Sequence, residues 1–343
     1  MGMVRIHAAA NAKSMAMAGR LLADRDYLAL LDMESEKEFI DYLRKHTYLS
    51  AAFIDAEEQD ENVGYLIKKH MLGCIDKLYY FYVDAYRAFF KTLMMRYEVE
   101  NIKLYLRAFS RNEDISLLKH HIAYSNVYSS IDYAMVGKAS DMREFIDSLR
   151  DTKYYSQLEG YMDEEPSKML FYMEMVLDRT YFSDLHESIL KLEAEDREKI
   201  LRLYGINVDL LNIQWIYRGR KFFGIASEEL FNFTLNNGRR YNFEKLKALC
   251  YMDLEKYKKL ISEGDYKFMF DGEEYLMEVA MERHLFNITE YAAGKERMSI
   301  VIPVVYIMKI EYEMRDLITI YEGIRYGYEG IEDFLVRNLR RVE

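Results

Sequence analysis

Residues Glu38–Arg44 read EFIDYLR, and residues Glu144–Arg150, 106 positions later, read EFIDSLR. Six of the seven residues are identical. A weaker third copy is Glu255–Ile261, which reads EKYKKLI. Internal repetition at a long, fixed period is the sequence signature of a fold built from copies of one unit. The stretch therefore predicts an internally repeated protein.

A second pattern also occurs three times, at offsets of 111 and 104 residues. An acid is followed three residues later by Asn or Asp, and apolar residues stand one, four and five positions after that. An Arg closes the first two copies, and Glu322 stands at that position in the third. The copies are Glu98, Asn101 and Arg107; Asp209, Asn212 and Arg218; and Glu313 with Asp316.

The spacing of this second pattern fits a helix, because residues i and i+3 lie on the same face. The apolar positions that follow form a stripe that would pack in a core. An Asn or Asp at the edge of such a stripe can satisfy the unpaired backbone groups of a neighbouring helix end. We therefore predict a structural rather than a reactive role for the acid and amide pairs.

Composition supports an all-α fold. The chain has 343 residues, half of them hydrophobic, but only 2 Pro and 16 Gly. Average usage would give about 17 Pro and about 24 Gly, and tight turns between strands need such residues. With a period near a third of the chain, we expect three similar helical units of residues 1–115, 116–225 and 226–343.

Charge, cysteines and hydropathy exclude several classes of protein. The net charge of −11 disfavours non-specific binding to nucleic acid or anionic lipid. Cys74 and Cys250 lack metal-ligand spacing and read as reduced core thiols of a cytoplasmic protein. The longest apolar run, Met298–Met308, has 11 residues, whereas a spanning helix needs about 20.

The order of these features resembles the C subunit of the prokaryotic V/A-type rotary ATPases, the counterpart of the d subunit in the eukaryotic vacuolar enzyme. The resemblance begins with Asn11-Ala12-Lys13 and continues through the Leu21–Leu31 and Phe39–Tyr48 stretches. The repeated acid and amide helices follow, and Pro303–Tyr306 precedes the last of them. It covers essentially the whole chain.

The resemblance implies a funnel of three similar helical bundles around a pseudo-threefold axis. It also implies a non-catalytic connector in the central rotor, which joins the central-stalk subunits of the soluble sector to the membrane proteolipid ring. Such a subunit transmits torque for ion transport and lies in the cytoplasm, peripheral on the membrane through the complex. We expect a monomer in isolation, with no cofactor, metal or nucleic acid.

Motifs for chemistry are not found in the sequence. There is no GxxxxGK[ST] phosphate loop and no GxSxG elbow. None of the seven histidines stands three residues after a Glu, as in di-iron helical bundles. A helical enzyme is therefore disfavoured. The alternative is a generic helical-repeat scaffold, which would show periods of about 34–45 residues instead.

Basic residues gather near the end of the chain, at Arg337, Arg340 and Arg341. They can complement the negative end of a helix dipole, which is the structural interpretation. The functional interpretation is contact with a partner, in which a local basic patch would orient one face toward the membrane ring.

Overall fold

The computed structural model describes residues 3–53, 62–295 and 298–339. Helices and 3-10 turns make up 74 % of this part of the chain, which contains no strand. The predicted all-α class is confirmed. The molecule divides into two compact units, one from residues 1–82 and 260–343, the other from residues 83–259. These two units do not coincide with the three predicted thirds, whose threefold relation stays a prediction.

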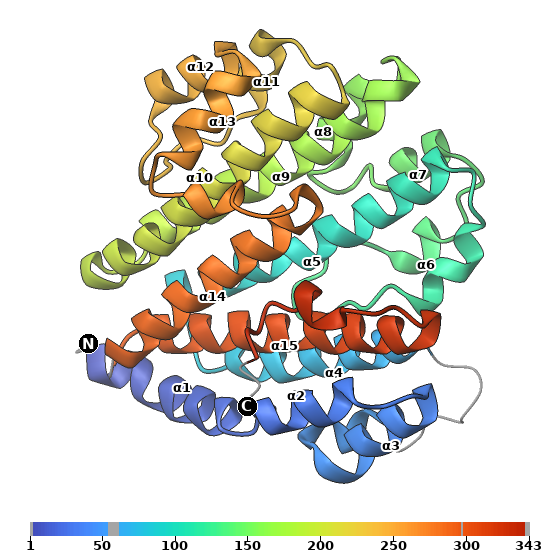
Figure 1. The fold of residues 1–343 in the computed structure, drawn as a ribbon, viewed down its shortest axis with the longest axis vertical. Coiled ribbons are helices and arrows are strands. Elements are labelled where there is room, and N and C mark those ends of the chain that lie inside the picture. The colour runs from blue at the N-terminus through green and yellow to red at the C-terminus, as the bar shows by residue number, and fades with distance from the viewer. Residues whose placement is uncertain (1–2, 54–61, 296–297, 340–343) are drawn as a thin grey trace. The chain divides into compact units, whose positions relative to one another are not determined.

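The first unit joins the two ends of the chain. Its long helices α4 and α15 run side by side, and α1 and α14 also pack against α15 (Figure 1). Its core includes Tyr27, Phe39 and Leu43 from the N-terminal part, together with Leu317 and Tyr321 from α15. Its elements are α1 (Met3–Ala18), α2 (Asp24–Leu31), α3 (Glu36–His46), η1 (Tyr48–Phe53), α4 (Val63–Tyr79), η4 (Lys267–Met269), η5 (Glu274–Leu276), α14 (Met277–Lys295), α15 (Val301–Tyr326) and η6 (Ile331–Phe334).

The second unit contains two further long helix pairings, α5 against α9 and α9 against α10, with short helices after α5 and α10. Lys103 of α5, buried itself, forms an ion pair with Asp178 of α9. Its elements are α5 (Asp84–Ser110), η2 (Ile115–His120), α6 (Tyr133–Val136), α7 (Met142–Ser148), α8 (Tyr155–Leu158), η3 (Glu159–Tyr161), α9 (Pro166–Leu190), α10 (Ala194–Phe222), α11 (Ser227–Phe233) and α12 (Phe243–Tyr251). Helix α13 (Leu254–Ser262) continues across the boundary between the units.

The repeated heptapeptide forms helices α3 and α7. Ser35 caps α3 by accepting from the Glu38 N–H, and Asp141 caps α7 by accepting from the Glu144 N–H. Each acid in turn accepts from the backbone N–H of the residue before the cap, Glu34 or Ser140, so that cap and acid together satisfy two backbone groups at the start of the helix. Local capping thus explains why the motif begins with Glu.

The third, weaker copy lies on α13, where Asp253 accepts from the N–H groups of Glu255 and Lys256. Counted from the capping residue, Tyr257 occupies the same position in its helix as Phe39 and Phe145 do in theirs. All three side chains are 0 % exposed. The third copy therefore aligns from Lys256, one residue later than the segment identified in the sequence.

The three long helices α5, α10 and α15 end alike. Each is followed by a residue in the left-handed conformation: Asn112 (φ 53°), Gly224 (φ 58°) and Gly327 (φ 65°). Glycine and Asn tolerate this conformation best, and it is the usual way to stop a helix. The chain then turns back over the last turn of its helix, and this return positions the loops described next.

Candidate functional site

The six acid and amide side chains predicted from the sequence are all buried. Glu98 and Asn101 lie on α5, Asp209 and Asn212 on α10, and Glu313 and Asp316 on α15. Their exposed fractions range from 0 % for Asp209 and Asn212 to 8 % for Asn101. A buried polar group is costly unless it is hydrogen-bonded, so the partners of each pair decide its role.

The α5 pair holds the segment that leads into α6. Glu98 accepts from the backbone N–H of Ser130 (2.9 Å) and from its hydroxyl. The Asn101 amide donates to the Ala123 carbonyl (3.1 Å) and to the Tyr133 hydroxyl (2.9 Å). Both side chains therefore tie the connection between α5 and α6 to the long helix.

The α10 pair holds the segment that leads into α12. Asp209 accepts from the N–H groups of Arg240 (2.7 Å) and Tyr241 (3.2 Å). Asn212 accepts from the N–H of Leu235 and donates to its carbonyl, both at 2.8 Å. The amide thus satisfies both backbone groups of one buried residue.

The α15 pair ties together the two ends of the chain. Glu313 accepts from the Leu22 N–H (2.7 Å), just before α2, and from the Tyr48 hydroxyl (2.6 Å). Asp316 accepts from the N–H groups of Val336 (2.6 Å) and Arg337 (2.9 Å). In the third copy, part of the segment held by the pair therefore comes from the start of the chain.

Burial shifts the titration of these carboxyl groups. Loss of hydration raises the pKa of Glu313 to about 7 and that of Asp316 to about 6, although the hydrogen bonds from Leu22, Val336 and Arg337 oppose the shift. Burial likewise raises the pKa of Glu98. The hydrogen bonds of all three carboxylates go to neighbouring segments of the chain. The arrangement fixes loops to the long helices.

The Arg position of the pattern behaves differently in each copy. Arg107 donates from Nε to Glu174 Oε1 of α9 (2.6 Å), whereas Arg218 on α10 is exposed. Glu322, the third counterpart, is half-buried on α15. The structure therefore does not unite these three positions in one contact.

The terminal arginines lie partly outside the described residues. Arg340 and Arg341 fall outside them. Arg337 Nε donates to Asp24 Oδ1 (2.6 Å) and its Nη1 to the Leu22 carbonyl (2.9 Å). Arg337 thus adds to the closure made by the α15 pair, and its contact with a partner stays a prediction.

Sequence reasoning missed a third member of each copy, a small residue seven positions after the Asn or Asp. These are Ala108, Gly219 and Gly323, and their carbonyls accept from Glu113, Ile225 and Tyr328 as the chain turns back (2.9–3.0 Å). An added Cβ would lie 2.4 Å from Leu230 at Gly219 and 2.5 Å from Ile331 at Gly323. The signal was the recurrence of Ala or Gly at one fixed offset.

Membrane-spanning helices and metal-binding clusters are both absent from the described residues. No helix among them is long and apolar enough to cross a membrane. No group of three or more His, Cys, Asp or Glu side chains within residues 3–53, 62–295 and 298–339 could hold a metal ion. Cys74 and Cys250 are buried free thiols.

Comparison with known proteins gives the family. The family model described as the ATP synthase (C/AC39) subunit matches residues 10–332, nearly the whole chain. The chain belongs to this family. The resemblance inferred from the ordered motifs is thereby confirmed.

Relatives in the family share low identity over long stretches. The A-type ATP synthase C subunit of Methanothermobacter thermautotrophicus is 25 % identical over 90 % of this chain and 81 % of the relative. The C subunit of Desulfurococcus sp. is 21 % identical over 93 % and 87 %, and that of Methanosarcina mazei 23 % over 71 % and 67 %. The family match over residues 10–332 includes all three copies of the acid and amide pattern.

Proposed function

We propose that this chain is the non-catalytic central-rotor connector of a V/A-type ATPase or ATP synthase. It would join the central-stalk subunits of the soluble sector to the membrane proteolipid ring and transmit torque for ion transport. The observation that carries the proposal is membership of the ATP synthase (C/AC39) subunit family over residues 10–332. The chain would lie in the cytoplasm, peripheral on the membrane through the complex, and be a monomer on its own.

The buried pairs support this role physically. A torque-bearing subunit has to resist relative movement of its helices and loops. Each pair fixes a neighbouring segment to a long helix through hydrogen bonds of its buried side chains, which lie in the core or at its edge, where water competes less for them. We propose that the three copies are similar bundles in a pseudo-threefold funnel.

The test is reconstitution of the complete complex with and without this chain. With it, ATP hydrolysis should drive ion pumping into sealed vesicles. Without it, the soluble sector should keep its ATPase turnover but separate from the membrane ring, so that pumping is lost. If pumping persists without the chain, the connector role is wrong, and a helical-repeat scaffold outside the rotor becomes the better description.

A further inference from the structure

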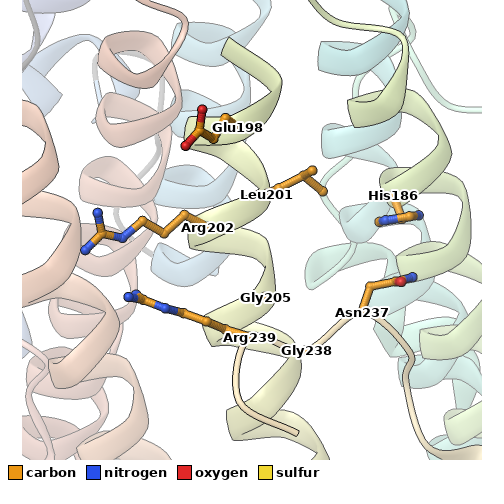
Figure 2. Close-up of a pocket in the computed structure, with 8 residues that line it drawn as sticks. All are labelled: His186, Glu198, Leu201, Arg202, Gly205, Asn237, Gly238 and Arg239. Atoms are coloured by element: carbon orange, nitrogen blue, oxygen red, sulfur yellow. The ribbon is translucent and has the colours of Figure 1, made fainter. Parts of the chain in front are cut away.

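The α10 copy carries an open pocket of about 470 Å³ within the second unit. Figure 2 shows the side chains that line it, from α9, from α10 and from the loop before α12. Arg202 of α10 and Arg239 of the loop extend in the same direction, one beside the other. The remaining lining residues are His186, Glu198, Leu201, Gly205, Asn237 and Gly238.

The loop that carries Arg239 is held rigidly on α10. Its backbone is fixed at Leu235, Arg240 and Tyr241 by the α10 pair, and the Arg239 N–H donates to the Gly205 carbonyl (3.1 Å). Asn237 has φ 68°, a conformation that few non-glycine residues adopt and that persists where surrounding contacts enforce it. The backbone position of Arg239, against the helix turn that follows Arg202, is therefore built into the fold.

Two glycines allow this close approach. A Cβ at Gly205 would lie 3.1 Å from the Arg239 backbone nitrogen, and one at Gly238 would lie 2.2 Å from Asp209 Oδ1. The residues four positions before the acid in the other copies are Met94 and Lys309, so the α10 copy alone has a glycine there. The missing side chain at Gly205 thus lets the loop approach the helix closely, and only the α10 copy has this glycine.

The other copies of the repeat act as internal controls. The residue seven positions before the acid is Lys91 on α5 and Tyr306 on α15, where α10 has Arg202. The residue three positions before the N-cap of the helix that follows the held segment is Ser129 before α6 and Arg20 before α2, where the α10 copy has Arg239 before α12. Since both other copies hold their loops without this pair, the fold does not require two arginines here.

The two arginine side chains of the pocket are available to bind a ligand. Both arginines are exposed, and neither forms an ion pair with a described residue, although Glu198 stands one turn before Arg202 on the same helix. Burial lowers the pKa of His186, which favours its neutral form. The two guanidinium groups therefore outweigh the single carboxylate of Glu198.

We infer that Arg202 and Arg239 form a docking site for an acidic side chain of a partner protein in the complex. Paired guanidinium groups match the two oxygens of a carboxylate and hold it at a fixed geometry. The whole chain is strongly acidic, with a net charge of −11, so this positive pair would select the orientation in which an acidic partner docks. The inference rests on the proposed function, because it takes the partner to be another subunit of the complex.

The experiment places an amine at the site and asks which carboxylate lies next to it. The variant Arg239→Lys is assembled into the complete complex and treated with a carbodiimide, which joins an amine to a carboxylate only at ion-pair distance. Mass spectrometry of the digest should show a link from position 239 to an Asp or Glu of another subunit. The control Arg143→Lys should link to Asp163, its ion-pair partner at 3.7 Å, and so shows that the reagent works.

A second measurement uses charge reversal. Arg202→Glu with Arg239→Glu should weaken association with the remaining subunits by roughly tenfold or more, as expected for loss of a close charge pair. Arg25→Glu with Arg143→Glu changes the net charge equally at two exposed positions and should stay within about twofold of wild type. Far-ultraviolet circular dichroism checks that both double variants keep their helices.

The outcomes separate the inference from the proposed function. If the complex assembles but position 239 links to nothing, or only to Glu198, the docking site is wrong and the connector role stands. The docking site is also wrong if both double variants bind the remaining subunits with equal affinity. If the wild-type chain does not assemble with the other subunits at all, the proposed function fails, and the docking site fails with it.

Discussion

The pairs on α10 and α15 occupy equivalent positions on their helices, yet the second member is Asn212 in one and Asp316 in the other. Asn212 faces one N–H and one carbonyl, both of Leu235, and an amide matches that combination. Asp316 faces two N–H groups, of Val336 and Arg337, and each donates to a different carboxylate oxygen, whereas an amide would present its NH₂ group to one of them. The choice between amide and acid therefore follows from which backbone groups the adjoining segment presents.

The comparison also shows a cost. On α10 the pair contains one carboxyl group, whereas on α15 it contains two, three residues apart and both buried. Asp316 contributes to the raised pKa of Glu313, after loss of hydration as the main cause. The α15 pair thus holds the two ends of the chain together, but it places two carboxyl groups close to each other. Its contribution to stability should therefore depend more strongly on pH than that of the α10 pair.

The largest effect is expected at the α10 pair. Asn212→Leu would leave both backbone groups of Leu235 without partners inside the core, at about 1–3 kcal/mol for each orphaned group. We expect the free energy of unfolding to fall by roughly 2–6 kcal/mol, measured by urea denaturation. The matched variant Asn101→Leu, at a slightly more exposed amide, should lose about 1–3 kcal/mol. An unchanged midpoint for Asn212→Leu would contradict the burial of this pair.

The next prediction exchanges the acid at Asp316 for an amide and the amide at Asn212 for an acid. Asp316→Asn has only one oxygen for two N–H groups, so one of them loses its acceptor, and unfolding should become easier by about 1–3 kcal/mol. Hydrogen exchange at Val336 and Arg337 should accelerate at the same time. The reverse change, Asn212→Asp, places a carboxylate against the Leu235 carbonyl and should destabilise at least as much. If either exchange is neutral, the amide-or-acid rule drawn from the two copies is wrong.

The third prediction uses the pH dependence of the α15 pair. Burial raises the pKa of Glu313 from 4.5 to about 7, so the folded protein keeps a proton that the unfolded chain has already lost. This contribution to stability is fully present below about pH 4.5 and disappears as the pH rises toward 7. Glu313→Gln does not titrate and can still accept from Leu22. Its stability relative to wild type should therefore increase by about 1–2 kcal/mol between pH 5 and pH 8.

The measurement is thermal or urea denaturation of both proteins across that pH range. Glu34→Gln, which removes the same charge from an exposed side chain, separates the effect of burial from that of net charge. A difference between Glu313→Gln and wild type that falls with rising pH would show that Glu313 is stabilised as the anion instead.

Much of this architecture could be predicted from the sequence, because periodicity reports on local structure. The spacing of Glu98 and Asn101, and of their counterparts, placed both members on one helix face, and the apolar stripe beside them placed that face in a core. The hydrogen-bond partners could not be predicted in the same way. Glu313 binds Leu22 across 291 positions of the chain, and no local pattern encodes such a contact. For the same reason the sequence suggested a helix dipole or a partner for Arg337 and could not predict its contacts with Asp24 and Leu22.

The smallest effect is expected at the small residue that follows each pair. Gly323→Ala would bring a methyl group to 2.5 Å from Ile331, so the side chain of Ile331 or the backbone of η6 has to shift. Overpacking of this kind costs about 1–3 kcal/mol, and the better helix propensity of alanine returns about 1 kcal/mol. We expect a net loss of about 1 kcal/mol in the free energy of unfolding.

The control is Gly73→Ala in α4, where nothing lies within 4 Å of the new methyl group, and it should stabilise the protein by about 0.5–1 kcal/mol. Equal gains at both glycines would mean that α15 tolerates the methyl group as α5 does at Ala108, and that the glycine is not what lets the returning chain approach its helix.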